Sequence, residues 1–106
     1  MKPRRVVITG MGLVTPFGCG VEEFWSGLTA GGSAVTRLDL TGGDSPSHLA
    51  APVPEFDPRA YVPDRKLLRI MCRGDRFALA AARMAVDQSG EPDLPPDRRG
   101  AFLGTG

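Results

Sequence analysis

Two cysteines and one histidine are the residues of this 106-residue chain whose types best suit nucleophilic chemistry. Cys19 lies between two glycines just before a predicted helix, and a helix N-terminus can favour the thiolate form of a cysteine. Cys72 lies in a basic stretch, which favours the thiolate in the same way. A nucleophile also needs a base within reach, and nothing in the sequence connects His48 with either thiol. We therefore predict two ordinary free thiols and a surface histidine.

Metal ligation and acid–base catalysis are not indicated either. The cysteines form no Cys-x-x-Cys pair, and a single histidine leaves too few ligands for a metal site. The carboxylates stand mostly beside proline or glycine, where turn and cap residues are common. The set comprises Asp39, Asp44, Glu55, Asp57, Asp64 and Asp75. These residues hold no complete catalytic constellation.

Nucleotide binding is suggested by Gly10-Met11-Gly12, which follows a short apolar run. A dinucleotide fingerprint requires a third glycine three residues later, at the start of a helix. Thr15 occupies that position, Pro16 follows it, and the next predicted helix begins only at Val21. We keep a nucleotide-binding α/β domain as a remote alternative. The glycines are better explained by a sharp turn and close backbone packing.

A basic cluster formed by Arg65, Lys66, Arg69 and Arg73 is the remaining candidate site. Lys66, Arg69 and Arg73 follow i, i+3, i+7 spacing and would share one face of a helix. Such a face is either simply solvated or a docking surface for an acidic partner.

These residues must be positioned by a mixture of strands, helices and loops. We predict a buried strand over Arg5–Thr9, a loop over Gly10–Gly20 and a helix from Val21 to about Ala30, ended by Gly31-Gly32. The spacing of Val21, Phe24, Trp25 and Leu28 gives this helix one apolar face. A long loop, 33–63, follows, and Val53, Phe56 and Tyr61 could attach it to the core.

The second half of the chain is predicted to be mainly helical. A short basic helix spans Asp64–Arg73, Gly74 interrupts it, and a longer helix spans Asp75–Gln88 with Gly90 as its stop. The longer helix is apolar on most of its surface and should be buried on several sides. A proline-rich turn over Glu91–Arg99 leads to a second apolar strand over Gly100–Gly106. This order is the beginning of an α/β pattern, so we predict the N-terminal piece of a larger protein.

Overall composition excludes several classes of partner. The net charge is +1, with 13 basic and 12 acidic residues, so neither nucleic acid nor an anionic membrane is indicated. No apolar stretch could span a bilayer, and the apolar run after the basic N-terminus is too short for a secretory signal. We expect a cytoplasmic protein.

Five segments, in this order and at this spacing, resemble the β-ketoacyl-acyl carrier protein synthases, the condensing enzymes of fatty acid and polyketide synthesis. The segments are RRVVITGMGLVTPFG, VEEFWSGLTAG, RK-x-x-R-x-M, FALAAARMA and G-x-x-x-GTG. The resemblance covers essentially the whole chain, is nearest to the elongating type, and is most specific in the opening segment.

The resemblance implies a thiolase-like α/β fold with αβαβα layers. Residues 1–106 would be the N-terminal part of the first half of the synthase domain, with no second domain in this chain. The nucleophilic cysteine and two histidines of the family would lie after Gly106, so no catalytic residue is assigned here and the chain alone should be inactive. The complete protein would condense acyl groups with malonyl-carrier protein by decarboxylative Claisen chemistry. A non-catalytic subunit resembling a chain-length factor is the alternative.

The resemblance also implies partners. In the family, basic residues of the helix after Asp64 help to dock the acidic acyl carrier protein; Lys66 and Arg69 fall on those positions, and Arg65 is adjacent. Acyl and malonyl thioesters are the implied substrates, a homodimer or heterodimer is implied, and neither a cofactor nor a metal is expected. Met71-Cys72-Arg73-Gly74 replaces the usual Met-Asp-x-Phe, which implies different packing at the helix junction and a divergent subfamily. Cys19 also departs from the family, which usually carries a small polar residue there.

Overall fold

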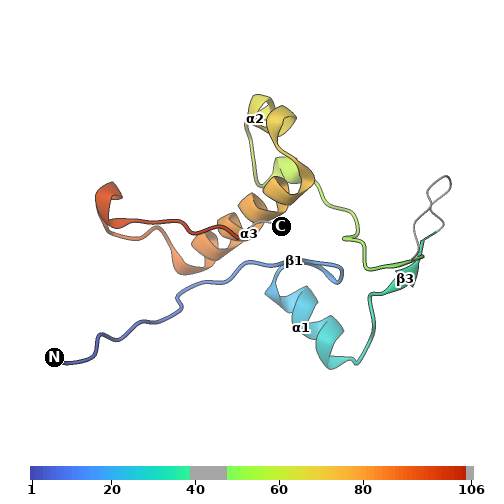
Figure 1. Ribbon diagram of the computed structural model, residues 1–106, viewed down its shortest axis with the longest axis horizontal. Coiled ribbons are helices and arrows are strands. Elements are labelled where there is room, and N and C mark those ends of the chain that lie inside the picture. Colours follow the sequence, from blue (N-terminus) through green and yellow to red (C-terminus); the bar gives the residue numbers. More distant parts are fainter. Residues whose placement is uncertain (39–47, 105–106) are drawn as a thin grey trace.

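The computed structural model describes residues 1–38 and 48–104 of the chain. Two short antiparallel ladders, β1 (Val14–Thr15) with β2 (Gly18–Cys19) and β3 (Thr36–Arg37) with β4 (Leu49–Ala50), lie on either side of α1 (Val21–Thr29) in the sequence. The remaining elements are η1 (Pro58–Ala60), α2 (Arg65–Ile70), α3 (Arg73–Ser89) and η2 (Pro96–Arg98). Figure 1 shows α3 near the centre of the molecule, with α2 beside one of its ends.

The predicted loop over Gly10–Gly20 contains a tight hairpin. β1 and β2 pair in the register Val14 to Cys19 and Thr15 to Gly18, and Thr15 Oγ1 accepts a hydrogen bond of 3.2 Å from the Phe17 amide. Gly18 has a φ of 128°, a conformation that other residues rarely adopt. The prediction of an irregular loop was therefore wrong at this point, because a two-residue ladder is too short to leave an alternating sequence pattern.

The helix predicted after this hairpin is confirmed as α1. Glu22 and Glu23 lie in its first turn, where negative charge complements the helix dipole, and Gly31 follows its end with a φ of 71°. Phe24 packs edge-on against Phe17 of the hairpin, with ring centroids 6.3 Å apart. Trp25 and Leu28 remain exposed, so only part of the predicted apolar face is covered by the described residues.

The N-terminal segment lies alongside α3 before it enters β1, as Figure 1 shows. A Cβ atom on Gly10 would collide with the carbonyl of Ala85, and one on Gly12 with the carbonyl of Ala81. The Met11 amide donates a 2.7 Å hydrogen bond to Gln88 Oε1. The predicted close packing of these glycines is confirmed, with the small alanines of α3 as the opposing surface.

The two predicted buried strands do not form in the described part of the chain. Val6, Val7 and Ile8 are 91%, 71% and 84% exposed, and residues 5–9 and 100–104 are irregular. A strand exists only through hydrogen bonds to a neighbour, and no described segment pairs with either one. Thr105 and Gly106, which complete the predicted second strand, lie outside the described residues.

The junction between α2 and α3 differs from the predicted one. The predicted short helix ends early, at Ile70, and the chain is extended at Met71 and Cys72. Gly74 lies inside α3 rather than between the helices, because the break is made by capping interactions and not by glycine. The predicted stop of the long helix at Gly90 is confirmed, with a φ of 80°.

The core of the described residues is small. Val62, Leu68 and Ala80 are its buried hydrophobic residues. Phe56 joins the core by stacking on Tyr61 at 5.9 Å and meeting Phe77 edge-on at 5.0 Å, so two of the three residues predicted to attach the long loop do so. The third, Val53, is half-buried. α3 itself is not buried on several sides, since Leu79 and Ala82 remain exposed.

The molecule is extended for its length. Its radius of gyration is 17.4 Å, whereas a compact domain of this size has about 13 Å. Its accessible surface is 9179 Å², whereas a folded monomer of 11.3 kDa exposes roughly 5,700 Å². The difference of about 3,500 Å² is surface that a self-contained domain of this mass would bury.

Candidate functional site

The candidate site is the exposed basic face of α2, formed by Arg65, Lys66 and Arg69. At 100° per residue these side chains fall within about 100° of the helix circumference, so they form one continuous face. Leu68 lies outside this arc and is buried. Such a six-residue helix is too short to be stable by itself, so its ends must be held by other groups.

The first end of α2 is held by Asp64. Its Oδ1 accepts hydrogen bonds from the backbone amides of Lys66, at 2.8 Å, and Leu67, at 3.4 Å. An aspartate at this position satisfies amides that have no partner within the helix. The side chain of Asp64 is therefore a helix cap, as its sequence context predicted.

The other end of α2 is held by Arg76 of α3. Its Nη2 donates a 2.7 Å hydrogen bond to the carbonyl oxygen of Leu68. Arg76 Nε is buried and has no hydrogen-bond partner among the described residues. This arginine is not among the residues predicted from the sequence; the available signal is a basic side chain in the first turn of a predicted helix that is otherwise largely apolar.

The three basic side chains carry free charge. Within residues 1–38 and 48–104 the ion pairs are Arg59 with Asp57, Arg83 with Asp87 and Arg99 with Glu91, so Arg65, Lys66 and Arg69 take part in none. Arg73, predicted to share their face, instead belongs to α3, and its guanidinium lies 4.8 Å from the centre of the Phe77 ring. The break at Met71–Cys72 separates it from the face predicted by helical spacing.

Three of the predicted turn and cap carboxylates have the predicted roles. Asp57 caps η1, Asp64 caps α2, and Asp75 accepts the amide of Cys72 in the capping box that begins α3. Hydrogen bonds from the Arg59 side chain and amide hold the pKa of Asp57 below its ordinary value. Hydrogen bonds from the thiol and amide of Cys72 lower the pKa of Asp75 in the same way. Asp39 and Asp44 lie outside the described residues.

The thiols and the histidine are not assembled into a nucleophilic site. Cys19 is half-buried in β2, Cys72 is exposed at the start of α3, and both are free. His48 is exposed, and its backbone carbonyl accepts a 2.8 Å hydrogen bond from the Leu38 amide. Burial, with Cys19 and Glu23 nearby, raises the pKa of Tyr61. In the described part of the chain, no three His, Cys, Asp or Glu residues are grouped to hold a metal ion.

The Gly-x-Gly segment does not form a phosphate-binding turn. Gly10 and Gly12 face the backbone of α3, so the space beside them is filled. The hairpin of β1 and β2 follows, in place of a helix N-terminus that could bind an anion.

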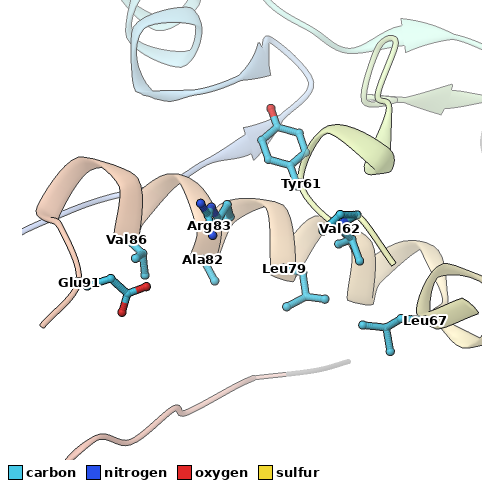
Figure 2. A pocket seen from close by; sticks show the side chains of 9 residues that line it. Tyr61, Val62, Leu67, Leu79, Ala82, Arg83, Val86 and Glu91 are labelled. Carbon is cyan, nitrogen blue, oxygen red and sulfur yellow. The ribbon is translucent and has the colours of Figure 1, made fainter. Parts of the chain in front are cut away.

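Two apolar cavities adjoin on one face of α3. One, of about 340 Å³, has a mainly apolar lining that includes Leu67, Leu79, Ala82 and Val86, which point to the same side in Figure 2. The other, of about 370 Å³, is also lined by Leu79 and Ala82, together with Phe102 and Leu103. Arg83, on the edge of the first, is paired with Asp87 at 3.0 Å. These cavities are an uncovered apolar surface rather than a reaction site.

Comparison with known proteins identifies the protein family to which this chain belongs. Residues 3–106 match the family described as beta-ketoacyl synthase, N-terminal domain. The chain is 42% identical to 3-oxoacyl-acyl-carrier-protein synthase 2 of Coxiella burnetii, over all of this chain and 26% of the relative. It is 42% identical to polyketide beta-ketoacyl synthase 2 of Streptomyces halstedii, over 82% of this chain and 21% of the relative.

A third relative is the actinorhodin polyketide beta-ketoacyl synthase 1 of Streptomyces coelicolor. It is 40% identical over 96% of this chain and 22% of the relative. The chain thus spans about a fifth to a quarter of the length of these curated relatives. No described helix is long and apolar enough to cross a membrane.

Proposed function

The chain belongs to the β-ketoacyl synthase family, and we propose that residues 1–106 form the N-terminal part of the first half of a β-ketoacyl-acyl carrier protein synthase, with no second domain among them. The observation that carries this proposal is the family match over residues 3–106. The names of the relatives include both fatty acid-type and polyketide synthases, so the proposal covers both pathways.

The proposed reaction is a decarboxylative Claisen condensation. An acyl thioester transfers its acyl group to a cysteine thiolate and releases the carrier thiol. Malonyl-carrier protein then loses CO₂, and the resulting enolate attacks the acyl-enzyme, which forms a carbon–carbon bond and frees the cysteine. We place the nucleophile and its histidines outside residues 1–106, so this chain alone is expected to be inactive, and the reaction as proposed uses no cofactor.

The complete fold in this proposal is thiolase-like, with αβαβα layers. Its support here is the uncovered apolar surface: Val6–Ile8, Phe102–Leu103 and the face of α3 that bears both cavities. Covering this apolar surface would stabilise the protein, because burial of apolar surface contributes about 25 cal/mol per Å². The remainder of the synthase would supply that cover, including the neighbours that turn residues 5–9 and 100–106 into strands.

The role proposed for this part of the protein is to dock the acyl carrier protein. Three exposed basic side chains, Arg65, Lys66 and Arg69, lie on one face of a helix that is held at both ends. Unpaired charges can attract an acidic protein without first breaking internal ion pairs. Their free charge, together with the family match, supports the docking assignment over a merely solvated face.

Other features of the complete protein also belong to the proposal. A homodimer or heterodimer is proposed, with acyl and malonyl thioesters as substrates and with neither nucleic acid nor a membrane as a partner. The two free thiols suit a reducing cytoplasm, where we place the protein.

The proposal is tested by supplying the complete protein with acyl-carrier and malonyl-carrier protein. We expect release of one CO₂ for each β-ketoacyl-carrier formed. Carrier binding without CO₂ release or product would contradict the enzyme proposal and favour the non-catalytic partner subunit. Absence of both binding and turnover would contradict both.

A further inference from the structure

At the junction between α2 and α3, one backbone hydrogen bond of a continuous helix is absent. Two hydrogen bonds to side chains of α3 replace it. If the helix continued through residue 72, the carbonyl of Leu68 would accept from the amide of Cys72, four residues later. Met71 instead has φ −89° and ψ 131°, and Cys72 has φ −71° and ψ 171°, so both residues are extended. That separates the carbonyl from the amide and leaves both in need of partners.

Neighbouring residues in the first turn of α3 provide these partners. Asp75 Oδ2 accepts from the Cys72 amide at 2.9 Å, and Arg76 Nη2 donates to the Leu68 carbonyl at 2.7 Å. The amide of Arg76 in turn donates to the Cys72 carbonyl at 3.2 Å as α3 begins. The donor and acceptor that would have joined the helices are therefore each satisfied by α3, which determines where α2 ends.

We propose that Arg76 is a positioning residue for carrier-protein docking, because its bond to Leu68 fixes the basic face of α2 relative to α3. This inference rests on the docking role proposed above. Arg76 contacts no carrier protein in this scheme; it acts through Arg65, Lys66 and Arg69. A six-residue helix has no stability of its own, so loss of the bond at its end would let the helix fray and spread its charges over many orientations.

Matched variants can separate the effect of the Arg76 charge from the effect of its hydrogen bond to Leu68. Arg76→Gln removes the guanidinium and its bond to Leu68, while Arg83→Gln removes the same charge from an exposed site seven residues further along α3. Arg76→Lys keeps the charge and one donor that can reach the Leu68 carbonyl. Lys66→Glu with Arg69→Glu tests the docking surface itself.

The experiment measures KM and kcat of the complete synthase for a carrier-linked acyl substrate and for the same acyl group on a small carrier-free thioester. We expect Arg76→Gln to raise KM for the carrier-linked substrate at least fivefold, with kcat unchanged. Its kinetics with the small thioester should equal those of the unaltered protein. Arg83→Gln should leave all values unchanged, and Arg76→Lys should restore at least half of the lost affinity.

Each other outcome contradicts the inference. Unchanged KM in Arg76→Gln, beside a raised KM in the Lys66→Glu, Arg69→Glu protein, would overturn the positioning role and leave docking intact. An equal rise in KM with both substrates would show that Arg76 has only a general structural role. If the double charge reversal has no effect on KM, the assignment of α2 as the docking surface is contradicted. The positioning role of Arg76, which depends on that assignment, is then contradicted as well.

Discussion

Cys72 occupies a position where the resemblance to the condensing enzymes implies an aspartate, and the structure gives that position a definite task. It is the N-cap of α3, and Asp75 accepts its amide proton in a capping box. A thiol sulfur is a poor hydrogen-bond acceptor, so the sulfur half of this box is weak. The aspartate that the resemblance implies here is among the best residues for an N-cap.

Replacing this weak cap should stabilise the protein. We expect Cys72→Ser to increase the free energy of unfolding of the complete protein by about 1 kcal/mol, because a hydroxyl oxygen accepts the Asp75 amide better than sulfur does. Denaturant unfolding measures the change. Cys19→Ser is the control, since Cys19 lies in β2 and caps no helix; an equal gain in both variants would contradict the capping explanation.

Asp75 should also make the junction sensitive to acid. Hydrogen bonds from Cys72 lower its pKa in the folded protein, so the carboxylate contributes stability above its unfolded pKa of about 3.9. That contribution is lost as the pH falls through the lower, folded pKa. The free energy of unfolding of Asp75→Asn should therefore approach that of the unaltered protein as the pH falls from 6 to 2.5. A difference in the free energy of unfolding between the two proteins that stays constant over this range would contradict the assignment. Asp93→Asn, in an exposed loop, is the control.

At the scale of elements, the sequence predicts the helices better than the strands. The apolar spacing of Val21, Phe24 and Leu28 and the glycines at 31 and 90 are local signals, and the helices that they predict are present. The strands over 5–9 and 100–106 were read from apolar runs, but a strand requires a partner that no local pattern specifies. The position of the α2–α3 break was also missed, because it depends on side chains of Asp75 and Arg76 rather than on Gly74.

Two glycine substitutions test how the elements pack. Gly12→Ala should destabilise the complete protein by about 1–3 kcal/mol, because the new Cβ would collide with the carbonyl of Ala81. Gly74→Ala should stabilise it by about 0.5–1 kcal/mol, because alanine favours the first turn of α3 and its Cβ would lie 3.8 Å from Cys72 Sγ, an ordinary contact. Thermal unfolding of both variants measures whether each substitution raises or lowers stability. Destabilisation of equal size in both variants would contradict the described packing.

The candidate site was predictable only in part. The basic stretch and the family resemblance predict Arg65, Lys66 and Arg69, and the structure shows them exposed on one face. Arg73 was grouped with them by helical spacing, which fails once the helix breaks. Arg76 was not identified, because its role arises from a contact across eight residues and two helices.

The whole molecule is an open arrangement with an accessible surface of 9179 Å², and only three hydrophobic residues are buried among residues 1–38 and 48–104. We therefore expect purified chain 1–106 to be poorly soluble, to bind a dye that reports exposed apolar surface, and to unfold without a sharp transition. Calorimetry and dye fluorescence measure this, with the complete protein as the control. A sharp cooperative melt of the isolated chain would show that it needs no further cover.

The central claim is that α2 docks an acidic acyl carrier protein. The most direct measurement is the affinity of the complete synthase for a phosphopantetheine-loaded carrier protein, by calorimetry at two salt concentrations. Lys66→Glu with Arg69→Glu is compared with Arg37→Glu with Arg98→Glu, which changes the charge equally on other elements. We predict roughly tenfold or greater loss of affinity in the first variant only, larger at low salt. Equal affinity in the two variants would contradict the claim.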